Sequence, residues 1–97
     1  MTRLLVSPRA RGNLRRLIVT HSLPTTTTDR FEASIQPLAK FPSLGHALGG
    51  RWSGYRYVLG PWRWMVIVYE YLEDQDLVAV VTVQDARSQR SPTADRP

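Results

Sequence analysis

Four arginines in the second half of the chain carry the side chains best suited to chemistry: Arg51, Arg56, Arg63 and Arg87. Seven of the nine aromatic residues are interleaved with them between positions 52 and 71. A guanidinium binds phosphate or carboxylate bidentately, and an aromatic ring stacks on a nucleobase. This pattern suits a nucleic acid or an acidic protein as partner. The competing interpretation, solvated arginines above an aromatic core, fits the composition better.

Two other side chains near these arginines are candidates for contact with a partner. Trp62 flanks the Gly60-Pro61 turn, where an indole can stay half exposed for binding, although packing is the preferred interpretation. Asp85 lies two residues before Arg87 and is expected to pair with an arginine. A carboxylate with an ordinary pKa near 3.9 is a weak general base.

Motifs for metal or cofactor binding are missing from the sequence. The chain has no cysteine, no glycine-rich phosphate loop and no zinc-ligand spacing. Its two histidines, His21 and His46, fall in separate predicted loops. We therefore expect no metal and no cofactor, and each histidine is at most a surface base.

The composition is that of one small basic domain. The 97 residues carry a net charge of +5, and twelve of the thirteen basic residues are arginine. Half of the eight acidic residues lie between positions 70 and 76, so the rest of the chain is strongly basic. No apolar run approaches the ~20 residues of a membrane span, and we expect a cytoplasmic protein.

The elements that position these side chains follow from the hydrophobic pattern. Residues 4–6 predict a strand, and Ser7-Pro8 predicts the start of a helix. A second helix should end near Gln36, because Pro37 cannot continue it. Each helix has one apolar stripe, formed by Ala10, Leu14, Leu17 and Ile18 in the first and by Phe31, Ile35 and Leu38 in the second.

Three strands are predicted in the second half, over residues 55–59, 64–71 and 77–83, after an irregular loop at 41–50. The order predicts an α+β fold: a strand, two helices, then a three-strand meander. The two-helix hairpin should cover one face of a curved antiparallel sheet, leaving the other face open. Residues 1–87 form the domain, and 88–97 read as a flexible polar tail.

Several short segments in this order resemble the RelE/ParE superfamily of toxins from bacterial type II toxin–antitoxin modules. They are the two-helix opening and the segments FPSLG at 41–45, GYR at 54–56, WMVIVY at 64–69 and VTVQDAR at 81–87. The resemblance covers residues 4–87 and implies two helices against a curved antiparallel sheet. It also implies an antitoxin partner, here expected to be an acidic or partly disordered segment.

The resemblance implies two alternative activities. Many members cut mRNA on the ribosome without a metal, whereas ParE-type members inhibit DNA gyrase. For cleavage, the basic positions that match are Arg56, Arg63 and Arg87, with Arg51, Trp62 and Asp85 as RNA- or target-binding residues. A histidine often stands at the position of Asp85, and a tyrosine often follows that of Arg87; this chain has neither. An endoribonuclease, a gyrase-type poison and an interaction module without toxicity all remain open.

Overall fold

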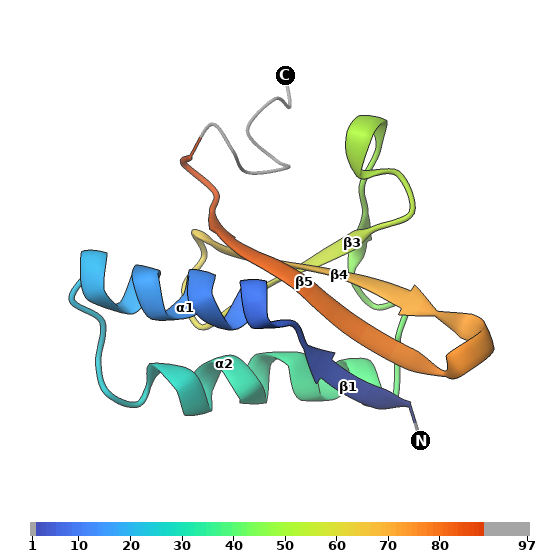
Figure 1. The fold of residues 1–97 in the computed structure, drawn as a ribbon, viewed down its shortest axis with the longest axis horizontal. Coiled ribbons are helices and arrows are strands. Elements are labelled where there is room, and N and C mark those ends of the chain that lie inside the picture. Colours follow the sequence, from blue (N-terminus) through green and yellow to red (C-terminus); the bar gives the residue numbers. More distant parts are fainter. Residues whose placement is uncertain (1, 89–97) are drawn as a thin grey trace.

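A computed structural model describes residues 2–88 of the chain and shows two helices below a curved five-stranded sheet (Figure 1). Three short 3-10 turns complete the framework: η1 (Gln36–Ala39), η2 (Gly50–Trp52) and η3 (Glu73–Gln75). The helices are α1 (Pro8–Thr20) and α2 (Thr27–Ile35), and the strands are β1 (Arg3–Val6), β2 (His46–Ala47), β3 (Arg56–Leu59), β4 (Met65–Leu72) and β5 (Leu77–Asp85).

Helix α1 begins where the sequence predicts. The Ser7 hydroxyl accepts a hydrogen bond from the Ala10 amide at 3.1 Å, which satisfies one of the free amides of the first turn. The helix then runs along β5. The side-chain oxygen of Asn13 accepts hydrogen bonds from the Thr82 hydroxyl at 2.7 Å and the Val83 amide at 3.2 Å. Asn13 thus accepts hydrogen bonds from the edge of β5 that would otherwise lack a partner, beyond the point where β1 ends.

Helix α2 ends at Ile35, and Pro37 lies in the 3-10 turn that follows. The predicted boundary near Gln36 and the distorted turn after it are confirmed. This turn still contributes to the core, because Leu38 is completely buried.

The sheet has the order β1-β5-β4-β3-β2. The meander of β3, β4 and β5 is antiparallel as predicted, whereas β1 pairs with β5 in parallel, with Leu4 opposite Val78. A parallel partner is possible because the two helices carry the chain away from β1 before the meander begins. The prediction of a wholly irregular 41–50 loop was wrong at two residues, since β2 pairs with β3.

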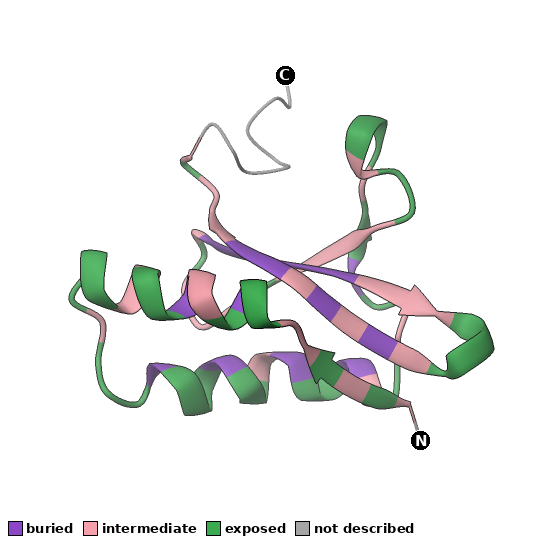
Figure 2. Cartoon of the chain, viewed as in Figure 1, coloured by how far each residue is buried: buried purple, intermediate pink, exposed green. Residues whose placement is uncertain are grey.

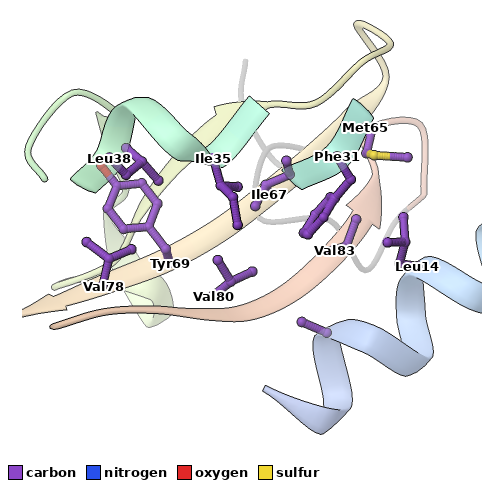
Figure 3. Close-up of a cluster of buried hydrophobic side chains, with 11 residues drawn as sticks. Leu14, Phe31, Ile35, Leu38, Met65, Ile67, Tyr69, Val78, Val80 and Val83 are labelled. Atoms are coloured by element: carbon purple, nitrogen blue, oxygen red, sulfur yellow. The ribbon is translucent and has the colours of Figure 1, made fainter. Parts of the chain in front are cut away.

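The core lies between the helices and the sheet, and burial is concentrated on β4 and β5 (Figure 2). Both predicted helical stripes point into it, which confirms that the helices cover one face (Figure 3). The predicted tail at 88–97 lies outside the described residues except for Ser88. Within residues 2–88 no helix is long and apolar enough to cross a membrane.

Candidate functional site

Five side chains meet where β5 ends and β4 begins, and we call them the β5-end cluster: His21, Trp62, Trp64, Asp85 and Arg87. His21 follows the last residue of α1, the tryptophans come from the β3–β4 connection, and Asp85 is the last residue of β5. Asp85 lies opposite Met65 in the sheet register, which brings the connection beside the end of β5.

Asp85 and Arg87 form a bidentate ion pair. The guanidinium donates from Nε to Oδ1 at 2.9 Å and from Nη2 to Oδ2 at 2.8 Å. The Arg87 amide also donates to Oδ1, at 2.9 Å. The pairing lowers the pKa of Asp85 well below its usual range, mainly through the Arg87 side chain and despite opposing desolvation. The expected pairing of Asp85 with an arginine is therefore found.

His21 contacts the same carboxylate. Its Nε2 lies 3.0 Å from Oδ2 of Asp85, and its Nδ1 lies 2.9 Å from the Thr20 hydroxyl. The imidazole stacks on Trp64, with ring centroids 4.6 Å apart and the planes 14° from parallel. Both ring nitrogens of His21 therefore have hydrogen-bond partners, the Asp85 carboxylate and the Thr20 hydroxyl.

The two tryptophans extend the cluster sideways. Trp62 and Trp64 stack with centroids 6.1 Å apart. The Arg30 guanidinium lies over Trp62 at 4.8 Å, and the Arg87 guanidinium lies over Trp64 at 5.3 Å. These cation–π contacts hold the arginines against flat surfaces. Both indoles are half-buried and pack against the core, which is the preferred interpretation for Trp62, while Trp64 is more exposed than a core residue.

Arg56 does not join the cluster. Its Nη1 donates to the Gly45 carbonyl at 2.9 Å and to the Ser43 carbonyl at 3.4 Å. It lies opposite Tyr69 in the register, on the face that the helices cover. Tyr69 holds the same loop, because its hydroxyl donates to the Pro42 carbonyl at 2.7 Å and accepts from the Gly45 amide at 2.9 Å.

Arg63 and Arg51 are exposed and lie in different places. Arg63 is in the β3–β4 connection, at the same end of the sheet as Arg87, and makes no hydrogen bond or ion pair within residues 2–88. Arg51 lies in η2 beside a groove of about 510 Å³ on the sheet face away from the core. The residues lining this groove are Arg9, Arg51, Trp52, Tyr55, Val81 and Thr82.

The structure thus brings together Trp62, Asp85 and Arg87, with Arg63 at the same end of the sheet, and separates Arg56 and Arg51 from them. Sequence reasoning missed the contacts of His21, which was expected in a loop as at most a surface base. One sequence feature could have indicated this position: His21 directly follows the helix whose apolar stripe packs along β5. Within the described residues no group of three His, Cys, Asp or Glu side chains could hold a metal.

Comparison with known proteins identifies one family. The family model described as the ParE toxin of the type II toxin–antitoxin system, parDE, matches residues 4–90. No curated protein matches the sequence.

Solved structures share the fold at low sequence identity. In the intact RelBE toxin–antitoxin complex of Escherichia coli, the matching chain is 16% identical with a TM-score of 0.68, over 91% of this chain and 100% of that chain. In the RelBE2 toxin–antitoxin complex of Mycobacterium tuberculosis, the matching chain is 17% identical with a TM-score of 0.64, over 87% of this chain and 96% of that chain. The isolated E. coli RelE toxin is 15% identical with a TM-score of 0.66, over 93% of this chain and 89% of that chain.

Proposed function

The chain belongs to the ParE toxin family of type II toxin–antitoxin systems, and we propose that this toxin poisons cells by binding a protein target rather than by cutting RNA. Its regular partner is an antitoxin. The target that the family resemblance suggests is DNA gyrase, and we infer that the toxin acts in the cytoplasm.

The engagement of the predicted catalytic groups carries this proposal. Metal-free RNA cleavage needs a base for the 2′-hydroxyl and free cations to stabilise charge on the attacked phosphate. Arg87 is neutralised by Asp85, and Arg56 is bound to loop carbonyls away from the β5-end cluster. Both nitrogens of His21 are engaged. Of the three predicted arginines, Arg63 alone has a guanidinium without a hydrogen-bond partner in the described chain.

Exposed apolar side chains on the loop beside Arg56 also support a protein target. Phe41 and Leu44, 61% and 57% exposed, lie on the loop that Arg56 and Tyr69 hold in place. Protein interfaces commonly combine such apolar anchors with arginine, and a preorganised loop lowers the entropy cost of binding. We infer that the role of Arg56 is to hold this loop rather than to contact a substrate.

The test is controlled expression in a bacterial host without antitoxin. The proposal predicts growth arrest with a DNA-damage response, stabilised gyrase–DNA cleavage complexes and intact mRNA on polysomes. Leu44→Ser should weaken the arrest, whereas Lys40→Ser, a change at another exposed position nearby, should not. Cleavage of mRNA at defined codons during the arrest would refute the proposal.

A second candidate, RNA cleavage with Arg56, Arg63 and Arg87 as catalytic groups, is favoured by one observation. The groove beside Arg51 joins two arginines with Trp52 and Tyr55, and none of the described residues lines it with a carboxylate. Such a surface suits a single-stranded nucleic acid, with phosphates on the cations and a base on the rings. In this case the toxin acts on ribosome-bound mRNA, Arg9→Ser and Arg51→Ser each reduce cleavage, and gyrase is unaffected.

A further inference from the structure

We propose that Asp85 is a built-in competitor for the anion site on Arg87, and that a carboxylate of the antitoxin displaces it in the toxin–antitoxin complex. This exchange requires an antitoxin but is independent of how the toxin poisons cells. It assigns to Asp85 and Arg87 a role that differs from catalysis.

The geometry shows first that the Arg87 guanidinium accommodates a carboxylate in the bidentate mode. Both oxygens of Asp85 accept from it, at 2.9 and 2.8 Å. The guanidinium also lies over the Trp64 ring at 5.3 Å, which fixes its plane. A preorganised fork of this kind binds a planar carboxylate through two parallel hydrogen bonds. An aspartate or glutamate of a partner therefore fits the same two donors.

The two members of the pair also differ in burial, so Arg87 can move away while Asp85 keeps other hydrogen-bond partners. The Asp85 side chain is 16% exposed, whereas that of Arg87 is 66% exposed. When the guanidinium turns outward, Asp85 keeps the Arg87 amide at 2.9 Å and His21 at 3.0 Å. No buried charge is then left unpaired, which is the usual obstacle to opening an ion pair.

The exchange replaces one carboxylate with another. While Asp85 is present, the new contact therefore adds little to the free energy of antitoxin binding. Exposed ion pairs contribute modestly, and their loss or gain changes a dissociation constant by about two- to five-fold. Asp85→Asn keeps the shape of the side chain and removes the competing charge. We therefore expect Asp85→Asn to tighten antitoxin binding by about that factor.

The experiment compares refolded full-length toxin variants with purified cognate antitoxin by calorimetry at low and moderate salt. Asp74→Asn is the matched control, because it removes the same charge in η3, at the opposite end of β4 and β5. Asp85→Asn should bind more tightly than Asp74→Asn, and the gain should disappear in Asp85→Asn/Arg87→Gln. A gain no larger than that of Asp74→Asn, or one kept by the double variant, would overturn the proposal. So would a gain seen with a single-stranded RNA oligonucleotide but not with the antitoxin.

Nuclear magnetic resonance gives a readout that needs no substitution. In the wild-type toxin, the Nε–Hε signal of Arg87 should shift when unlabelled antitoxin binds, while its amide, still bonded to Asp85, shifts less. In Asp85→Asn the Nε–Hε signal should move to the position of a free arginine and return when antitoxin is added. An Nε–Hε signal of the wild-type protein that does not respond to antitoxin would show that Arg87 stays with Asp85.

Discussion

Arg56→Ala should lower the stability of the toxin measurably, because the structure gives Arg56 a structural role. The lost contacts are a charge-assisted hydrogen bond to the Gly45 carbonyl at 2.9 Å and a longer one to Ser43 at 3.4 Å. Hydrogen bonds from charged groups contribute about 1.5–3 kcal/mol, and the half-buried site places the value near the lower end. We expect the free energy of unfolding to fall by about 1.5–2 kcal/mol, and Tm by about 10 °C.

The assay is urea denaturation of refolded toxin, followed by fluorescence of the tryptophans. Arg63→Ala is the control, because this exposed arginine makes no hydrogen bond or ion pair in the described chain. A surface change of this kind should stay within about 0.5 kcal/mol of the wild type. Tyr69→Phe should be strongly destabilising, since it leaves the Gly45 amide and the Pro42 carbonyl without their partner.

A double-mutant cycle makes the test stricter. Arg56 and Tyr69 bind opposite ends of the same residue, Gly45, so the two substitutions should be non-additive by about 0.5 kcal/mol or more. The reasoning fails if Arg56→Ala is as stable as Arg63→Ala. Loss of toxicity together with unchanged stability would instead identify Arg56 as a group that contacts substrate.

Three further outcomes follow from the same contacts. Arg63→Ala should reduce toxicity without changing the circular dichroism spectrum, as measured by colony counts after induction; full toxicity would exclude it from the target surface. Gly45→Ala should cost about 1–3 kcal/mol in urea denaturation, because its Cβ would lie 2.7 Å from the Tyr69 hydroxyl, whereas Gly49→Ala, with open space around it, should be neutral. The stabilising effect of Asp85, whose pKa is lowered in the folded protein, should be complete above the unfolded pKa of about 3.9 and fade as pH falls further. The difference in unfolding free energy between wild type and Asp85→Asn, followed from pH 6 to pH 2, must shrink, and a constant difference would contradict the pairing.

Much of the fold could be predicted because its signals are local. Ser7-Pro8 predicts the start of α1, Pro37 predicts the end of α2, and the apolar stripes predict which helix faces are buried. The parallel pairing of β1 with β5 could not be predicted, because nothing local in either strand specifies its partner or the direction of pairing.

The site was harder to predict because side-chain partners depend on the register. The alternation at residues 55–59 was correct, but it could not show that Arg56 lies on the helix-covered face and reaches back to Gly45. The position of His21 beside Asp85, 64 residues away, depends on the length of α1 and on its path along β5. The Asp85–Arg87 pair was within reach of sequence reasoning because the two residues are close in the chain.

The position of β5 in the sheet also determines when this toxin can fold. β5 is the last described strand in the sequence, yet it lies between β1 and β4 and contributes Val78, Val80 and Val83 to the core. A ribosome releases the chain from the N-terminus, at about 5–20 residues per second. Until residues 77–85 have emerged, β1 has no partner in the sheet and α1 has no strand to pack along. The toxin therefore cannot complete its fold until synthesis is nearly finished. An antitoxin that is already present can be close to the chain before the toxin first folds.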